Sequence, residues 1–410
     1  MLQRKILAVC VLGVFLRIIG LIGSESLRSD YYWEYGELAK NLAEGRGYSL
    51  WYFNNDALDH HFNPSQQVFP SAYMPPGYVF FLFPFILIKD IVLRNLLLFA
   101  VQTIVSVASI LLVWNLTRKL ISERSALIAA FLVAALPEFV YATLSFTPTV
   151  LYHSLVLCLL FILVERSVLT ESRSTIAVAF LIALLVMLRF EFLLVGFAWS
   201  VLLFSQKKRT TAAAVVGAML LVLLPWIVRN AVVLGEFIPG TTNVGLNLYR
   251  GSNGVAIGSW GEESTIPEIR QLPRDKRFEL SMNELYLRHG LQYMRSHPFE
   301  MIEGLFLKTW DLWVLNLHDP SGRALSPILA VISVILFTTF LIGLVRSPSR
   351  SKNPYLVLFL ICSTLIAMAF FVMPRYQTMM RIAVVPFSAY GMEILSEKLM
   401  KVLGISAVSS

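Results

Sequence analysis

Charged side chains with catalytic potential lie beside or inside the apolar runs of this chain. Asp30 follows the first apolar run, and Arg189 and Glu191 interrupt the 32-residue run 174–205. A carboxylate at a membrane boundary can serve as a general base that takes a proton from an acceptor hydroxyl or amine. An arginine within an apolar stretch is energetically costly and usually functional. The pattern indicates acid–base chemistry next to a bound anion.

Basic residues that could bind a phosphate occur at four separate places. Arginine carries forked donors that match phosphate oxygens, and fixed cations stabilise the charge that grows on a departing phosphate. Simpler interpretations stay open: Asp30 as one of several solvated loop acids, Arg189 as a salt-bridge partner of Glu191, and Lys308 and Arg375 as side chains extending to the interface. The candidate phosphate ligands are Arg189, Arg229, Lys308 and Arg375.

The composition identifies the element type that must position these residues. The chain is 57% apolar and 15% charged, with a mean hydropathy of +0.68, whereas soluble domains carry about 25% charge. We therefore expect an all-α integral membrane protein with about 10 transmembrane helices, within a range of 9–12. The expected spans are 5–22, 92–114, 125–146, 149–165, 174–188, 191–205, 211–228, 325–345, 354–373 and 380–397.

The basic residues predict the orientation of these spans. The +8 net charge arises largely from short connections on one face, so it is not a signal for nucleic acid, and that face is cytoplasmic by the positive-inside rule. Asp30, Arg189 and Arg375 then fall on the extracytoplasmic face. We expect three parts: a catalytic core 1–228 with a first outer loop at 23–91, a second outer loop 229–324, and C-terminal helices 325–410.

Several segments should not cross the membrane in the ordinary way. The apolar run 77–88 is too short to cross alone and is expected to lie in or dip into the outer interface, with a short tilted span as the alternative. The hairpin 174–205 should place Arg189 and Glu191 below the outer surface. In the outer loops we expect helices at 34–41, 276–296 and 300–317, with an irregular segment at 240–261. The 300–317 helix combines Trp310 and Trp313 with Lys308, which suits a helix lying on the outer leaflet.

Short motifs along the chain resemble one enzyme superfamily. They are Asp30 followed by Tyr35 and Gly45-Arg-Gly47-Tyr48, the pair Pro75–Pro76, Pro225-Trp226 with Arg229–Asn230 and Asn243 to Asn247, His297-Pro298 before Lys308, and Arg375–Tyr376. Their ordered set resembles the GT-C superfamily of polyprenyl-phosphate-sugar glycosyltransferases. It is most similar to the branch of the dolichyl-phosphate-mannose–protein mannosyltransferases and the lipid A aminoarabinose transferase, glycosyltransferase family thirty-nine.

The resemblance implies a GT-C-like fold and an inverting transfer from a polyprenyl-phosphate sugar to a lipid, glycan or protein acceptor outside the cytoplasm, in a prokaryotic inner membrane. It implies that Asp30 is the general base and adds Asn230, Asn247 and Tyr376 to the donor-binding candidates. It places Glu34, Tyr35, Pro75, Pro76 and Glu191 near the site. The sugar and the acceptor stay open.

The metal requirement is a point where this chain departs from the family pattern. Family members usually carry a second acid where the third span emerges, but Ser145 to Thr149 contain no carboxylate, and Glu138 lies about two turns deeper. No cofactor is assigned, and a site for Mg²⁺ or Mn²⁺ built from two acids is doubtful. Asp59, His60 and His61 could supply ligands, although adjacent loop histidines are more often solvated.

Two other functions remain alternatives at this point. A lipid-sugar flippase or polytopic transporter would be expected to show internal repeats or helices broken at the midplane, and no repeat is visible in the sequence. A membrane scaffold would keep the spans and the charge bias without needing Asp30 and Arg189 together. No GxGxxG, P-loop or DxD motif indicates a soluble nucleotide-sugar donor.

Overall fold

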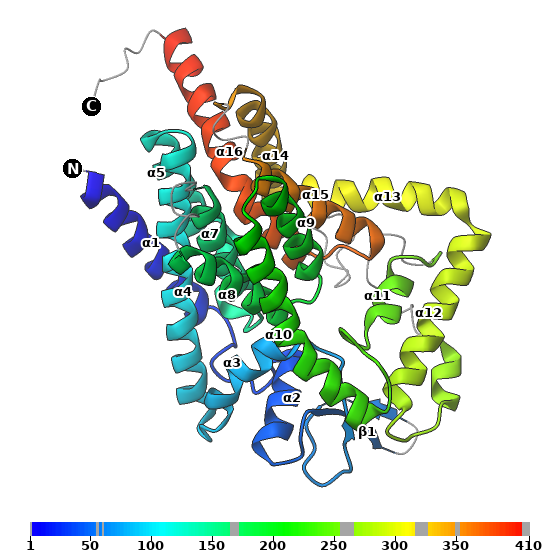
Figure 1. Cartoon of the computed structure of the whole chain (residues 1–410). Coiled ribbons are helices and arrows are strands. Elements are labelled where there is room, and N and C mark those ends of the chain that lie inside the picture. The colour runs from blue at the N-terminus through cyan, green and yellow to red at the C-terminus, as the bar shows by residue number, and fades with distance from the viewer. Residues whose placement is uncertain are drawn as a thin grey trace.

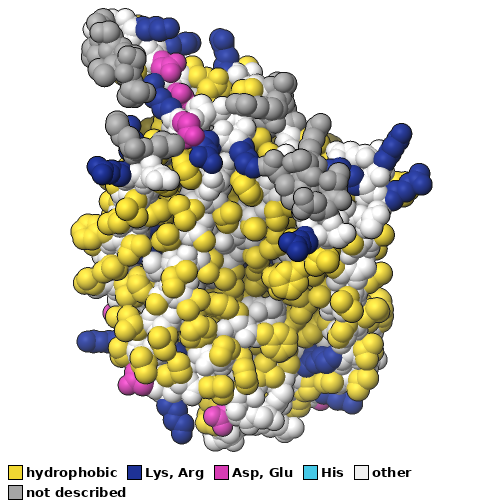
Figure 2. Space-filling model, turned by 60° about the vertical axis from the view of Figure 1, so that its left-hand side comes forward, with side chains coloured by type: hydrophobic (Ala, Val, Ile, Leu, Met, Phe, Trp, Pro, Cys, Tyr) yellow, Lys and Arg dark blue, Asp and Glu magenta, His cyan; other side chains and the backbone are white. Residues whose placement is uncertain are grey.

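The protein is a helical bundle with a smaller part attached to one of its ends (Figure 1). The computed structural model describes residues 2–54, 57–59, 61–164, 172–254, 266–315, 327–348 and 353–403. An apolar band covers one face of the bundle below a group of lysines and arginines (Figure 2). Such a band is the surface that a bilayer requires. The predicted integral membrane protein with an all-helical bundle is therefore confirmed.

Each predicted span coincides with one helix or with a bent pair. Four helices are long and apolar enough to cross on their own: α1 (Leu2–Ile22), α4 (Ile91–Leu120), α10 (Arg209–Leu234) and α14 (Pro327–Arg346). The pair α5 (Glu123–Ala135) and α6 (Pro137–Leu144) is bent by 47°. The number of crossings stays a prediction, since the remaining helices are shorter or more polar: α7 (Thr149–Val164), α8 (Ser172–Leu188), α9 (Phe192–Ser205), α15 (Pro354–Ala369) and α16 (Pro374–Val402).

Arg17 of α1 explains how the bent pair is tolerated inside the bundle. Pro137 has no N–H to offer the carbonyl of Val133, which a straight helix would pair. The fully buried guanidinium of Arg17 donates to that carbonyl at 3.3 Å and to the Ala134 carbonyl at 3.1 Å. Its other acceptors are Ser106, Thr143 and the Gly13 carbonyl. Arg17 thus satisfies backbone groups that lipid could not.

The helix ends separate into the two sets that the sequence predicts. At the end rich in basic residues, Thr175 contacts Thr211 at 2.9 Å, Tyr355 contacts Gln206 at 2.9 Å, and Arg124 contacts Glu397 at 3.3 Å. The opposite ends carry Asp30 and Arg189. The alternation of the spans is therefore as expected, while the assignment of the basic end to the cytoplasm stays a prediction.

The outer part contains structure that the sequence analysis did not predict. A three-stranded antiparallel sheet of order β2-β1-β3 lies in the first loop, and a helix, α11, forms where an irregular segment was expected. Leu50 and Tyr52 of β1 are fully buried, which explains the strand. The elements are α2 (Trp33–Ala43), β1 (Ser49–Asn54), β2 (Ala57–Asp59), β3 (Phe69–Pro70), α3 (Pro76–Ile86), α11 (Val244–Arg250), the 3-10 helix η3 (Pro267–Gln271), α12 (Phe278–Ser296) and α13 (Pro298–Trp313).

A single buried acid fastens the two outer loops to each other. The carboxylate of Glu279 in α12 accepts hydrogen bonds from Trp51 Nε1 and Ser71 Oγ, both at 2.6 Å, from the Ala72 N–H at 2.7 Å, and from Thr242 Oγ1. Burial raises the pKa of Glu279, and these four donors oppose that shift. Since the donors belong to both loops, Glu279 fixes one loop relative to the other and hence the residues that they hold over the bundle.

Candidate functional site

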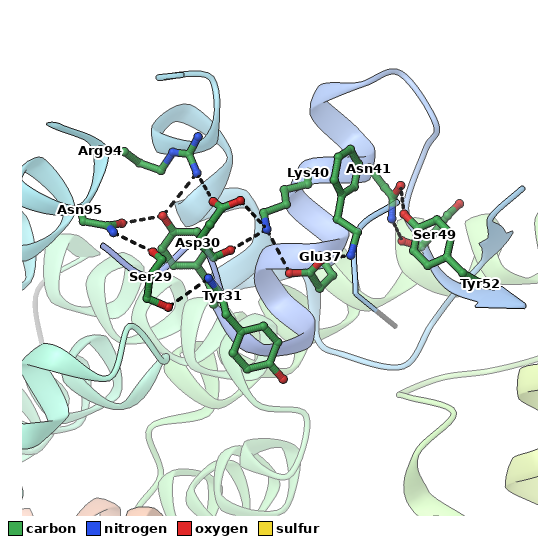
Figure 3. A network of polar contacts seen from close by, with 12 residues as sticks. Ser29, Asp30, Tyr31, Glu37, Lys40, Asn41, Ser49, Tyr52, Arg94 and Asn95 are labelled. Carbon is green, nitrogen blue, oxygen red and sulfur yellow. Dashed lines mark hydrogen bonds and ion pairs between the residues drawn. The ribbon is translucent and has the colours of Figure 1, made fainter. Parts of the chain in front are cut away.

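Asp30 lies in the connection between α1 and α2, where two cations hold its carboxylate (Figure 3). Oδ1 is 2.5 Å from Arg94 Nη1, and Oδ2 is 3.2 Å from Lys40 Nζ. Lys40 Nζ also donates to the Asp30 backbone carbonyl at 2.6 Å. The side chain of Asp30 remains 47% exposed. The ion pairs therefore fix the orientation of the carboxylate and leave a side of it accessible.

Two residues in the first turn of α4 hold the segment that carries Asp30. Asn95 is fully buried and donates to the carbonyls of Ser26, Leu27 and Ser29 at 2.8–3.1 Å. Its side-chain oxygen accepts a hydrogen bond from the Tyr32 hydroxyl at 2.5 Å. Sequence reasoning missed both Arg94 and Asn95. The available signal was a polar pair placed at the start of a long apolar span, where unpaired polar groups are costly.

Arg189 and Arg375 meet on the ring of Tyr376. The Arg189 guanidinium is 4.6 Å from the ring centroid and the Arg375 guanidinium 5.3 Å, within cation–π range. Arg189 also pairs with Glu191 in the α8–α9 turn, as the simpler interpretation expected. Arg375 lies in the first turn of α16, and its Nε is buried with no hydrogen-bond partner among the described residues. The structure thus brings together four predicted site residues from two separate segments.

Tyr35 connects this cluster to the segment of Asp30. It lies in the first turn of α2, and its ring packs edge-on against Tyr78 with 5.3 Å between the ring centroids. Burial raises the pKa of Tyr35 to about 12, while the charges of Arg189 and Arg375 oppose the shift. The tyrosine therefore keeps its hydroxyl proton at neutral pH. Since only four residues separate Tyr35 from Asp30, the predicted base and the predicted cations lie at one end of the bundle.

Lys308 is buried in the outer part, with 3% of its surface exposed. Its Nζ donates to the Met368 carbonyl at 3.2 Å, and among the described residues this is a single hydrogen bond for a group with three donors. Burial lowers the pKa of Lys308 to about 8. An ammonium held with so little compensation is unfavourable unless an anion completes its coordination.

Gly251 brings a fourth cation to the same place. A Cβ on Gly251 would lie 1.9 Å from the Phe370 carbonyl oxygen and 3.1 Å from Lys308 Nζ, so no larger residue fits. This close approach places the preceding Arg250 within the electrostatic reach of Tyr376 and Glu34, and burial lowers the pKa of Arg250. Sequence reasoning missed Arg250 because it falls in the segment interpreted as an irregular loop. We call the resulting group the basic cluster: Arg189, Arg250, Lys308 and Arg375.

Three predicted donor ligands have structural contacts instead. Arg229 donates to the carbonyls of Ser71 at 2.6 Å and Tyr48 at 2.8 Å, so it fastens the first loop to α10. The buried Asn230 accepts from Arg229 and donates to the Ile238 carbonyl. Asn247 donates to Asn243 within the start of α11. These contacts occupy both terminal nitrogens of Arg229 and the side-chain amides of Asn230 and Asn247, and their role as phosphate ligands stays a prediction.

The proline pair and Glu34 flank the basic cluster. Pro75 caps α3 in an extended conformation and Pro76 occupies its first position, which suits a residue without an N–H. A Cβ on Gly77 would lie 2.6 Å from the Met187 carbonyl oxygen, so α3 packs directly on the end of α8 next to Arg189. Glu34, in the first turn of α2, acts electrostatically on Arg250.

The described residues that were considered for a metal have other partners, and the metal requirement stays a prediction. Glu138 pairs with Arg381 at 2.6 Å, and Ser145, Thr147 and Thr149 hydrogen bond to one another. Both carboxylate oxygens of Asp30 already face cations. No group of three or more His, Cys, Asp or Glu that could hold a metal ion occurs in the described ranges. His60 and the side chain of Asp59 lie outside the described residues.

Comparison with known proteins identifies the fold. Residues 74–229 match the family described as dolichyl-phosphate-mannose-protein mannosyltransferase. No curated protein matches the chain. Among solved structures, the archaeal oligosaccharyltransferase AglB from Archaeoglobus fulgidus, in complex with an inhibitory peptide and a dolichol-phosphate, has a TM-score of 0.52 at 16% identity, covering 100% of this chain and 52% of that one.

Two further structures are similar. The Archaeoglobus fulgidus oligosaccharyltransferase tethered to an acceptor peptide has a TM-score of 0.54 at 15% identity, covering 100% of this chain and 52% of that one. ArnT from Cupriavidus metallidurans bound to undecaprenyl phosphate has a TM-score of 0.40 at 13% identity, covering 98% and 80%. The chain thus spans about half the length of the oligosaccharyltransferase structures. The GT-C resemblance predicted from the motifs is confirmed at the level of the fold.

Proposed function

We propose that this chain, a multi-pass membrane protein with the GT-C fold, transfers a sugar from a polyprenyl-phosphate donor to an acceptor on the extracytoplasmic face. The observation that supports this most is the basic cluster, whose four cations outnumber the described acids closest to them, Glu34, Glu191 and Asp311 on the buried face of α13. It lies at the same end of the bundle as Asp30. A charge excess of this kind suits a phosphate monoester or diester.

The phosphate would lie between Lys308 and Arg375. Lys308 keeps two N–H donors beyond its bond to Met368, and Arg375 has a buried Nε that lacks a partner among the described residues. Arg375 also lies in the first turn of α16, where the helix dipole favours an anion. The AglB structure holds a dolichol-phosphate, and a lipid phosphate of this class would satisfy the unpaired donors here.

The reaction is a single displacement at the anomeric carbon. The acceptor oxygen or nitrogen forms a bond to that carbon while its proton passes to Asp30. The bond between the anomeric carbon and the phosphate oxygen breaks, and its electron pair stays on the departing polyprenyl phosphate. The basic cluster stabilises that charge. Attack from the side opposite the leaving group inverts the anomeric configuration.

No step of this reaction is assigned to a metal ion, because the residues near Asp30 do not fit a two-acid site. Arg94 and Lys40 orient the carboxylate directly. The basic helix ends would lie in the cytoplasm of a prokaryotic cell, with the site outside the inner membrane. The sugar, and the choice between a lipid, glycan or protein acceptor, would be set by residues around the exposed side of Asp30.

The experiment compares Asp30→Asn and Arg189→Ala with the wild type in vesicles that contain a radiolabelled polyprenyl-phosphate sugar. Loss of the base should lower turnover about 10²- to 10⁴-fold. Removal of Arg189 should lower turnover less, since three cations remain. Thermal unfolding in detergent should show that both variants fold.

A matched control is the pair Glu284→Gln and Arg288→Ala, an exposed acid and base on α12. Both should retain wild-type turnover. Retained turnover in Asp30→Asn and Arg189→Ala would reject the enzyme. Movement of labelled donor across the bilayer with no glycosidic product would instead support a transporter.

A further inference from the structure

Helix α13 is amphipathic, and the proposed reaction does not account for its exposed apolar face. Its buried face carries Gly304, Lys308, Asp311 and Leu312. Its opposite face exposes four large apolar side chains at spacings of three and four residues, which places them in one stripe. Their exposed fractions are 84% for Phe299, 52% for Ile302, 73% for Phe306 and 50% for Trp310.

Contacts with α15 fix the depth of this stripe in the membrane. Trp313 Nε1 donates to Thr364 Oγ1 at 3.0 Å, and Lys308 reaches the Met368 carbonyl. Thr364 lies five residues before the end of α15 at Ala369, which is about 7.5 Å along a helix axis. Amphipathic helices that lie in a membrane interface insert by about 5–10 Å. The anchoring point of α13 is therefore at the depth of the outer interface.

The neighbouring end of α12 suits the same location. Arg295 is exposed in its last turn, directly before α13 begins. A basic side chain beside an apolar helix face is typical of segments that contact lipid headgroups and acyl chains at once. A second protein copy would need a complementary surface at the same shallow depth, whereas lipid is present there in any case.

We propose that α13 lies in the plane of the outer leaflet with Phe299, Ile302, Phe306 and Trp310 among lipid chains, and that it thereby holds Lys308 at the depth of the lipid phosphate groups. The second half of this statement rests on the proposed function. It makes the cluster selective for a donor whose phosphate is carried by the membrane. A soluble sugar phosphate would have to leave the water phase to reach Lys308.

The proposed position of α13 in the outer leaflet can be tested by measuring its depth in the membrane, without an activity assay. The three native cysteines are replaced by alanine, and a bimane label is placed at Phe306→Cys or, as the control, at Glu284→Cys on α12. In vesicles with doxyl-labelled lipids, the label at 306 should be quenched and the label at 284 should not. A label at 306 that stays unquenched and exposed to water, or one that is shielded while the cysteine forms disulfide-linked dimers, would overturn the proposal.

Kinetics test the consequence for the donor. The double variant Ile302→Ser and Phe306→Ser should raise KM for a long-chain polyprenyl-phosphate donor about tenfold, because two large apolar groups no longer hold the helix in lipid. KM for a short, water-soluble prenyl-phosphate donor should not change. The control Leu221→Ser removes an apolar residue of α10 that lies inside the predicted span and is 73% exposed, and it should leave both values unchanged.

The two failures are distinguishable. Quenching at 306 with no sugar transfer from either donor would leave the seating intact and remove the proposed function. Equal rises of KM for both donors would show that α13 acts on the site as a whole and not through lipid depth.

Discussion

Arg17 and Lys308 are two buried cations that differ in how far hydrogen bonds compensate the free-energy cost of burying their charge. Arg17 is fully buried in the bundle and donates to five acceptors on four helices. Lys308 is nearly as buried but donates to a single carbonyl among the described residues. A buried charge without partners costs several kcal/mol. The protein therefore gives every nitrogen of the Arg17 guanidinium at least one acceptor and leaves two of the three Lys308 donors for something else to satisfy.

The comparison separates structural from functional charges. Arg17 compensates for the missing N–H of Pro137, and Arg229 likewise bonds to backbone carbonyls. Both hold the fold. Lys308 and Arg375 retain donors that the described protein groups do not use. The number of backbone carbonyls that each side chain binds, not burial or charge alone, distinguishes the structural cations from those that we assign to a substrate.

The largest effects that test the difference between Arg17 and Lys308 are expected when each cation is replaced by methionine. Lys308→Met should lower kcat/KM for the lipid donor about 100-fold, the usual size for loss of one electrostatic contact to a leaving group. Its melting temperature should stay unchanged or rise, since an uncompensated charge is removed. Arg17→Met leaves two backbone carbonyls unpaired and should destabilise the fold by about 2–4 kcal/mol. Thermal unfolding and initial rates on the same preparations measure both effects.

Lys308 would prove to be structural if its methionine variant melted as early as Arg17→Met. Arg17 would prove to have a catalytic role if its variant kept the wild-type melting temperature and lost activity. A normal KM with a lowered kcat in Lys308→Met would place its contact in the transition state alone.

Sequence reasoning located the apolar helices and predicted which helix ends lie at the same end of the bundle. It could not distinguish structural cations from substrate-binding ones. Apolar runs and their alternation placed Asp30 and Arg189 at one end of the bundle, because span length and basic residues are local signals. Arg229 and Lys308 looked equivalent, since their different acceptors lie 158 and 60 residues away along the chain. The sequence does not show which backbone carbonyl a distant side chain will contact. Arg250 was missed because its segment was interpreted as an irregular loop, whereas it forms α11.

The second test uses pH, because Lys308 has a pKa lowered by burial to about 8. Below that value the ammonium is charged and can bind phosphate. As pH rises through about 8 the charge is lost, so kcat/KM should fall by up to tenfold per pH unit. Lys308→Arg keeps its charge to much higher pH, so its kcat/KM should not fall above pH 8. If kcat/KM falls at the same pH in the wild type and in this variant, the ionisation belongs to another group.

Stability without donor should move in the opposite direction. A lysine whose pKa is lower in the folded state binds fewer protons there than in the unfolded state, so the free energy of unfolding rises with pH between about 8 and the ordinary lysine value of 10.5. The stabilisation is lost as pH falls through about 8. If kcat/KM falls while the free energy of unfolding rises above pH 8, the charge of Lys308 serves ligand binding and not stability. If both quantities change in the same direction, that role is contradicted.

The smallest effect is expected at Arg229, a cation near the site whose two terminal nitrogens both donate to backbone carbonyls. Arg229→Lys should lower kcat/KM by less than about threefold, because lysine can still donate to one of the two carbonyls of Ser71 and Tyr48. Limited proteolysis should cut the first outer loop faster in this variant, because one of the two contacts that fasten it is lost. A 100-fold fall of kcat/KM with an equally resistant loop would return Arg229 to the phosphate ligands. The number of backbone carbonyl partners would then not be what separates structural from substrate-binding cations in this protein.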